Sequence, residues 1–127
     1  MEDSKINGLV VNVIDEYSLA INLGSRENIS LGDKFLVYFL SKEDIIDPET
    51  KESLGKLEYV VGQGKVIHIQ EKMSIIESIE ERVENKKTIR KTSSNIFSPK
   101  QEEVIEPKII SLPFDHPQVG YKVRKIQ

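Results

Sequence analysis

The sequence predicts an all-β fold: a small, barrel-like antiparallel domain of about six to seven strands over residues 1–127. Two observations predict it. Segments of β-branched or alternating apolar residues, each bounded by turn residues, recur along the first 70 residues, and a similar segment ends the chain. With 127 residues, 38% of them hydrophobic, the chain also has the size of one globular domain. Such a domain buries about two thirds of its unfolded surface, so we expect a single core.

Two strands joined as a hairpin are predicted near the N-terminus. Residues 6–14 are rich in β-branched side chains. One face of this segment is predicted to hold Leu9, Val11 and Val13. Residues 17–23 alternate in polarity. Their inward face is predicted to hold Tyr17, Leu19, Ile21 and Leu23. Only two acidic residues separate the segments, which indicates a tight hairpin turn.

A third strand is predicted at residues 34–40, after a turn-rich connector. This segment is apolar on both faces, which is typical of a central or covered strand. Residues 41–56 are less regular. They contain an Asp-Pro turn at Asp47, and Gly55 can adopt a positive φ, so we expect a hairpin tip here.

Two further strands are predicted at residues 56–61 and 65–70, with a break at Gly62-Gln63-Gly64. Residues 72–83 fit two patterns. The spacing of their apolar residues is helical at Ile75, Ile76, Ile79 and Val83. Alternation of isoleucine with polar residues also permits a strand, and periodicity slightly favours the helix.

The composition of residues 82–112 predicts a flexible polar insertion or long loop. Hydrophobicity is low, charge is mixed, and Pro99 and Pro107 interrupt the segment. Its basic cluster is Lys86, Lys87, Arg90 and Lys91. Nearby acidic residues could act as counter-charge for this cluster, in which case the segment is only a solubilising loop.

A last strand is predicted at residues 119–126, and it must return to the sheet for Val123 and Ile126 to pack. This region repeats an earlier pattern of an apolar residue, a glycine, any residue, a lysine and an apolar residue. The two copies are Leu31-Gly32-Asp33-Lys34-Phe35 and Val119-Gly120-Tyr121-Lys122-Val123. We interpret them as two equivalent corners of one small barrel, each with an apolar peg and a glycine that bends the backbone.

One longer stretch carries a family resemblance. It comprises Ala20-Ile21-Asn22-Leu23-Gly24-Ser25-Arg26-Glu27-Asn28-Ile29-Ser30-Leu31-Gly32-Asp33-Lys34-Phe35, then Ile46-Asp47-Pro48-Glu49-Thr50 and Leu54-Gly55. It resembles the C-terminal domain of flagellar assembly protein T and its uncharacterised bacterial relatives, which read NLGS…G…GD.F and then DP.TGE.LG. The resemblance covers about residues 6–80 and 117–126. It implies an all-β, barrel-like accessory module without known catalysis, and a strand at residues 73–80.

The chain departs from that family pattern at two glycines. Asn28 replaces one of them and is the next-best residue for a left-handed backbone. Lys51 replaces the other, which predicts a looser hairpin tip or another turn type. The flagellar protein is also periplasmic and has further domains, so only the fold is carried over.

Composition excludes several classes of site and favours a non-membrane protein. The chain has no cysteine, which excludes disulfides, thiolate zinc sites and iron–sulfur clusters. No apolar run reaches the roughly 18 residues that span a bilayer. The first five residues lack the layout of a secretory signal. We therefore expect a cytoplasmic protein if the chain is complete, and a periplasmic one if it is a domain of a secreted protein.

No constellation of residues predicts catalysis, a cofactor or a metal. His68 and His116 are 48 positions apart and are interpreted as a strand-face and a turn histidine. The acidic group that could suit calcium lacks the spacing of a calcium loop and is interpreted as a solvated hairpin tip. It consists of Asp44, Asp47, Glu49 and Glu52. Gly62 and Gly64 are interpreted as strand punctuation or a bulge rather than a phosphate loop.

The sequence therefore predicts a non-enzymatic protein-interaction or assembly module, whose partner is another protein or a copy of itself. The alternative is a small barrel that binds oligonucleotides, although a net charge of −3 and the absence of tryptophan argue against it. Its possible anion or nucleic-acid contacts are Lys86, Lys87, Arg90, Lys91, Lys122, Arg124 and Lys125. An enzyme or small-ligand binder would need a deep apolar pocket with convergent polar groups.

Overall fold

The computed structural model describes residues 6–92 and 100–127, and only the backbone at residues 86–92 and 100–105. The described chain forms eight strands and one short 3-10 helix at Ser25–Glu27. It divides into two compact units: one ends at residue 80 and resumes at residue 112, and the other is residues 81–111. Among the described residues no helix has the length and apolar character needed to cross a bilayer.

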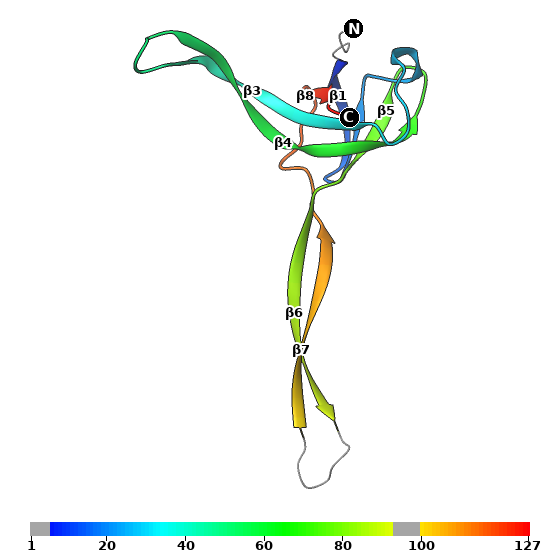
Figure 1. The fold of residues 1–127 in the computed structure, drawn as a ribbon. Helices are drawn as coiled ribbons and strands as arrows, with labels where there is room; N and C mark the ends of the chain where they lie inside the picture. The colour runs from blue at the N-terminus through cyan, green and yellow to red at the C-terminus, as the bar shows by residue number, and fades with distance from the viewer. Residues whose placement is uncertain (1–5, 93–99) are drawn as a thin grey trace. The chain divides into compact units, whose positions relative to one another are not determined.

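The first unit is a closed, antiparallel six-stranded barrel (Figure 1). Its strands are β1 (Asn7–Asp15), β2 (Ser18–Ile21), β3 (Lys34–Ile46), β4 (Ser53–Ile69), β5 (Ser74–Ser78) and β8 (Lys122–Lys125). Their order around the barrel is β1-β2-β5-β4-β3-β8. Because β8 pairs with both β1 and β3, the C-terminal strand closes the barrel. The predicted small all-β barrel is confirmed.

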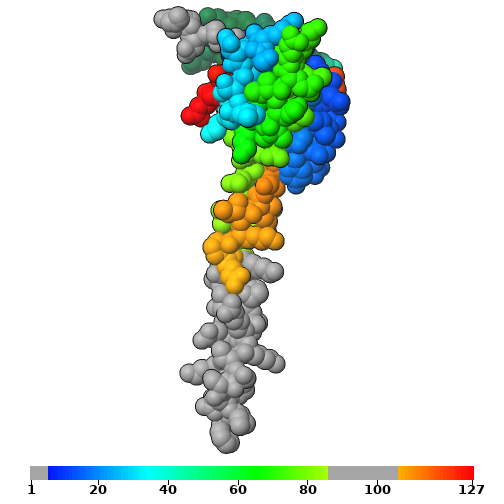
Figure 2. All heavy atoms as spheres, turned by 90° about the vertical axis from the view of Figure 1, so that its right-hand side faces the viewer, coloured from blue at the N-terminus to red at the C-terminus, as the bar shows by residue number. Residues whose placement is uncertain are grey.

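The barrel interior is filled by apolar side chains. Its buried residues are Val10, Leu19, Ile21, Leu23, Ile29, Phe35, Val37, Val61, Val66, Ile76, Phe114 and Val123. On the face shown in Figure 2, the N-terminal strands in blue and the β4–β5 region in green pack side by side. The prediction for β3 is also correct, since its residues 35–38 are buried on both faces.

The predicted inward face of β1 is wrong. Val10 is 1% exposed and lies in the core, whereas Leu9 and Val11 are 40% and 42% exposed. A register shift between Val10 and Asn12 explains the difference, because a bulge changes which residues face inward. Val13, beyond the bulge, packs partly against the core as predicted. The inward face predicted for residues 17–23 is right at Leu19, Ile21 and Leu23, but Tyr17 is exposed.

The predicted break at residues 62–64 is wrong, because β4 runs through both glycines. The alternative interpretation as a bulge is right: Val37 pairs with Gly62 and Tyr38 with Val60, so one residue of β4 is extra. Both glycines also lie close to the buried Phe114 ring. A Cβ on Gly62 would lie 2.9 Å from Phe114 Cδ1, and one on Gly64 would lie 3.0 Å from Phe114 Cζ.

The segment that periodicity assigned to a helix is a strand, as the family resemblance implied. β5 pairs with β2 on one side and with β4 on the other. Ile76 is fully buried, and the Ser74 hydroxyl, also buried, donates to the Leu23 carbonyl at 2.7 Å. Two neighbouring strands satisfy the backbone here, so tertiary pairing overrides a helical spacing of isoleucines.

The two repeated pentapeptides form equivalent corners, as predicted. Gly32 has φ 88° and Gly120 has φ 97°, and each begins the entry into a strand. The Gly32 N–H donates to Val66 O at 2.9 Å, and the Gly120 N–H donates to Val10 O at 2.8 Å. In both corners the accepting valine donates in return to the residue after the glycine, Asp33 or Tyr121. The expected apolar pegs are wrong, however, because the residues before the glycines, Leu31 and Val119, are 67% and 63% exposed.

The structure also shows the backbone at the two positions where this chain lacks a glycine of the family pattern. Asn28 has φ 61° and takes the left-handed conformation expected of it. Lys51 has φ 63°, so it holds the same left-handed backbone that a glycine would supply.

The second unit is a β-hairpin of β6 (Glu81–Thr92) and β7 (Lys100–Ser111). The prediction of a long loop is therefore wrong for these residues, while residues 93–99 and Pro99 lie outside the described part of the chain. The pairing places opposite charges across from each other, which favours antiparallel strands. Examples are Glu84 with Lys108, Lys86 with Glu106, and Arg90 with Glu102. Pro107 is tolerated because a two-stranded sheet consists of edge strands.

Candidate functional site

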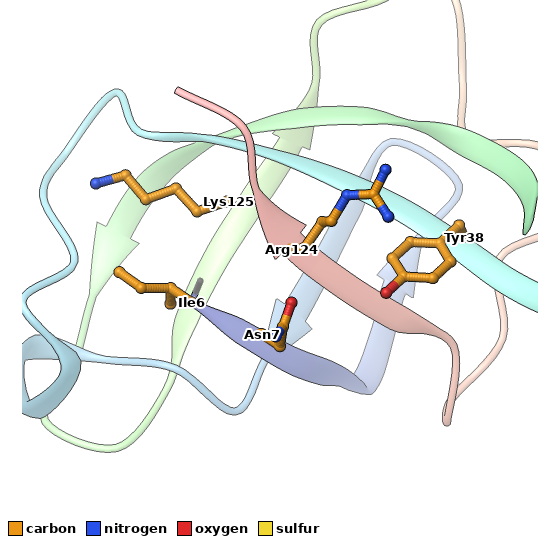
Figure 3. A pocket seen from close by; sticks show the side chains of 5 residues that line it. All are labelled: Ile6, Asn7, Tyr38, Arg124 and Lys125. Atoms are coloured by element: carbon orange, nitrogen blue, oxygen red, sulfur yellow. The ribbon is translucent and has the colours of Figure 1, made fainter. Parts of the chain in front are cut away.

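The predicted basic residues of the C-terminal strand lie beside two hollows next to β8, and Figure 3 shows the first of them. The first hollow, about 380 Å³, is lined by Ile6, Asn7, Tyr38, Arg124 and Lys125. The second, about 280 Å³, is lined by Asn7, Gly8, Tyr38, Leu40, Glu58, Lys122 and Val123. Because they share two residues, we treat them as one feature, the β8 groove. It combines three cations with apolar side chains.

Arg124 is held in place within the β8 groove. Its Nη1 donates to Glu58 Oε2 at 2.6 Å, and both side chains are partly exposed. This hydrogen bond raises the pKa of Arg124, against a smaller opposing effect of burial, so the guanidinium stays charged. The guanidinium also lies 4.9 Å from the centre of the Tyr38 ring, a cation–π contact. Figure 3 shows the two side chains next to each other.

The other two cations of β8 differ in their surroundings. Lys125 Nζ lies 3.4 Å from Asp33 Oδ2, so a carboxylate partly balances its charge. Lys122 is exposed and has no ion-pair partner within the described residues. Counting contacts with the described residues, the groove offers one cation without an ion-pair partner and two that have carboxylate neighbours.

The remaining predicted cations cannot be added to this surface. Lys86, Lys87, Arg90 and Lys91 lie on β6 of the hairpin unit, and their side chains are outside the described part of the structure. The structure thus groups Lys122, Arg124 and Lys125 on one strand, and the joint patch of all seven residues stays a prediction.

A second surface, which the sequence does not reveal, is the part of the β3–β4 pair that has left the other barrel strands. β3 contacts β8 only over Phe35–Tyr38, and β4 contacts β5 only over Gly64–Ile69. Beyond the pair formed by Leu40 and Glu58, the described strands pair only with each other. We call residues 41–57 the arm (Figure 1). Two-stranded sheets of this kind are marginally stable on their own.

The arm exposes aliphatic side chains and ends in an acidic tip. Its exposed aliphatic residues are Ile45, Ile46, Leu54 and Leu57, each between 43% and 62% exposed. The tip, residues 43–52, carries five carboxylates and one ammonium group. Asp44 interacts with Lys56 at 3.5 Å, and Asp47 Oδ1 accepts the Glu49 N–H at 2.8 Å.

The residues considered for metal binding or catalysis stay apart. Within the described residues, no three histidine or acidic side chains gather closely enough to hold a metal ion. His68 lies on β4 and His116 in the turn region before β8, each in the setting predicted for it. The His116 side chain is exposed, with its Nδ1 2.7 Å from Asp115 Oδ1.

The structure also contains a stack of three aromatic rings that the sequence does not predict. The Phe39 ring lies 5.1 Å from that of Tyr59 and 4.9 Å from that of Tyr121, both nearly parallel to it. The three residues come from separate parts of the chain, so only strand register brings them together. The stack lies where the arm leaves the barrel, since Phe39 pairs with Tyr59 next to the Leu40–Glu58 pair.

Comparison with known proteins adds no relative. No family model matches the chain, and neither the curated proteins nor the solved structures contain a match. The resemblance to the C-terminal domain of flagellar assembly protein T therefore stays a prediction that rests on residues 20–35 and the Asp-Pro turn.

Proposed function

We propose that this chain is a non-enzymatic protein-interaction or assembly module and that the arm is its main contact element. The observation that carries this proposal is the pairing of the arm strands with each other alone, together with four exposed aliphatic side chains. The barrel closes without the arm, since its pairings involve other parts of β3 and β4. The arm is thus available for a partner.

Edge strands with exposed apolar residues favour contact with another protein. Among the described strands, each arm strand has one edge without a neighbour, and this edge can accept a further strand. Covering aliphatic side chains is favourable by about 25 cal/mol per Å² of apolar surface removed from water. Apolar side chains fill the barrel interior, so we expect a partner to bind on an outer surface.

The oligonucleotide alternative has weaker support. In its favour, Lys122, Arg124 and Lys125 share one strand of a small barrel. Against it, Glu58 and Asp33 already neighbour two of these cations, and the net charge of the chain is −3. A polyanion would also leave the aliphatic residues of the arm uncovered.

The test is affinity capture from a lysate of the source cells, with and without nuclease. We compare the wild-type chain with the variant Ile46→Ser/Leu54→Ser, which changes two exposed arm residues. Ile67→Ser is the matched control, because Ile67 is 42% exposed on the barrel part of β4. Circular dichroism checks that all three proteins are folded.

We expect nuclease-resistant protein partners that the arm variant loses and the control retains. If the arm variant captures the same partners as the wild type, the arm is not the contact element. If all partners disappear with nuclease, the oligonucleotide alternative replaces this proposal.

A further inference from the structure

We infer that the arm of one copy docks in the β8 groove of a second copy of the same chain, joining copies head to tail. This inference rests on the proposed function, because it names the partner that the arm binds. The two surfaces consist of different residues of one chain, so each copy can both give and receive a contact. An interface between two different patches is heterologous and can repeat from copy to copy.

Charge complementarity is the first argument. The tip carries five carboxylates against one ammonium group, with Asp44 already next to Lys56. The four-residue strand β8 carries three cations, of which Arg124 and Lys125 already have carboxylate neighbours. Glu49 and Glu52 are exposed, and no ion pair within the described residues engages their side chains. Lys122 likewise has no ion-pair partner in the described part of the chain. A contact between these groups therefore forms without breaking the Arg124–Glu58 or Lys125–Asp33 pairs.

Apolar surface on both sides is the second argument. The groove is lined by Ile6, Tyr38 and Leu40 in addition to its charged groups. The tip combines its carboxylates with Ile45 and Ile46. An acidic and aliphatic segment therefore matches the groove in both respects, whereas a nucleic acid matches only its charge.

The contact must form between copies rather than within one. Tyr38 lines the groove, and Ile46 ends the same strand eight residues later. At about 3.4 Å per residue the two are roughly 27 Å apart along β3. Pairing with β4 up to the Ile46–Ser53 pair keeps the arm extended, so its tip cannot fold back into its own groove.

Pairing of two arms with each other is less favourable. It would bring two acidic tips into one interface, each with an excess of four negative charges. Like charges placed together across an interface oppose association. The β8 groove, in contrast, offers the arm cations on β8.

The experiment is sedimentation of the purified full chain at about 10–500 µM and about 50 mM salt, where electrostatic contacts are little screened. The wild type is compared with the arm variant Glu49→Lys/Glu52→Lys and the groove variant Lys122→Glu. We expect concentration-dependent association of the wild type and about tenfold or greater weakening in each variant, because charge reversal replaces attraction by repulsion.

The decisive sample is a mixture of the two variants. The reversed arm meets a groove with a reversed residue, and the native arm meets a native groove, so the mixture should associate again. Matched controls are Glu71→Lys/Glu77→Lys and Lys72→Glu, which change exposed charges outside both surfaces and should associate like the wild type. Thermal unfolding confirms that each variant is folded.

Three results would overturn the inference. A wild-type chain that stays monomeric throughout contradicts docking between copies, while arm-dependent capture of another protein would still support the proposed function. Association that Glu49→Lys/Glu52→Lys abolishes but Lys122→Glu leaves intact indicates arm-to-arm pairing. If the wild-type chain is a monomer that binds a fluorescent oligonucleotide, and Lys122→Glu does not bind it, the groove is a nucleic-acid surface instead.

Discussion

The contact between Phe114 and Gly62 allows a quantitative test of how the barrel core is packed. Phe114 is 2% exposed and lies in the segment that leads to β8. A Cβ at position 62 would have its three nearest atoms all in Phe114, at 2.9, 3.5 and 3.8 Å. The substitution Gly62→Ala therefore has to displace this ring, and no other residue obstructs it as closely.

We expect Gly62→Ala to lower the free energy of unfolding by about 2–4 kcal/mol. Overpacking of a core contributes about 1–3 kcal/mol of this. The φ of 156° at Gly62 adds roughly 1 kcal/mol, because side chains other than glycine are strained there. In a Phe114→Val background the Cδ1 atom is gone, so only the backbone contribution should remain.

The assay is urea unfolding, followed by circular dichroism, of the wild type, both single variants and the double variant. Phe114→Val keeps part of the apolar volume, which protects against complete unfolding; full truncation of a buried phenylalanine costs about 3–5 kcal/mol. The double variant should be more stable than additivity predicts by about 1–3 kcal/mol. Additivity within about 0.5 kcal/mol would refute the direct contact.

Three further predictions test the corners, the buried hydroxyl and the hairpin. Ser74→Ala should cost about 1–2 kcal/mol in the urea assay, because it leaves the buried Leu23 carbonyl without its donor; a neutral variant contradicts this. Gly32→Ala and Gly120→Ala should each cost roughly 1 kcal/mol and add, since an added Cβ meets no atom within 4 Å and only the positive φ opposes it. Unequal costs would contradict the equivalence of the corners. Replacing residues 81–111 by Asn-Gly should leave the spectrum of the barrel unchanged, because the residues on either side are already joined by a 2.8 Å backbone hydrogen bond; loss of cooperative unfolding would show that the hairpin is required.

Strand positions in the barrel are largely predictable because alternation of apolar residues reports a half-buried sheet. The inward face of β1 was missed because the bulge after Val10 changes the alternation locally, and nothing in the sequence marks it. β5 was ambiguous for a related reason. Five residues are too few for periodicity to separate a strand from a helix, and pairing with β2 and β4 decides the matter.

The hairpin at residues 81–111 was missed because its charges look like those of a solvated loop until they are placed in register. Each half alone is polar and lacks a sustained apolar face. The register of β6 and β7 pairs basic residues of one strand with acidic residues of the other, as with Glu84 and Lys108. The sequence therefore contains the signal for this hairpin only as a match between the charges of two separate segments.

The candidate site was predicted in part. Composition alone marks Lys122, Arg124 and Lys125 as a cationic strand. Their partners come from distant segments: Glu58 is 66 positions from Arg124, so its effect on that cation depends on the closure of the barrel. The arm could not be predicted as a surface, because the sequence does not reveal where β3 and β4 lose their other neighbours.

The two proposed contact surfaces share one strand, which constrains how copies can assemble. β3 contributes Tyr38 to the β8 groove and Ile46 to the arm, so the same paired backbone connects the receiving surface to the donating one. Each added copy should therefore repeat nearly the same rotation and translation. A repeated heterologous contact closes into a ring if the rotation allows and otherwise grows as a filament. Sedimentation would separate these outcomes, since a ring yields one dominant larger species and a filament yields a series whose mean size rises with concentration.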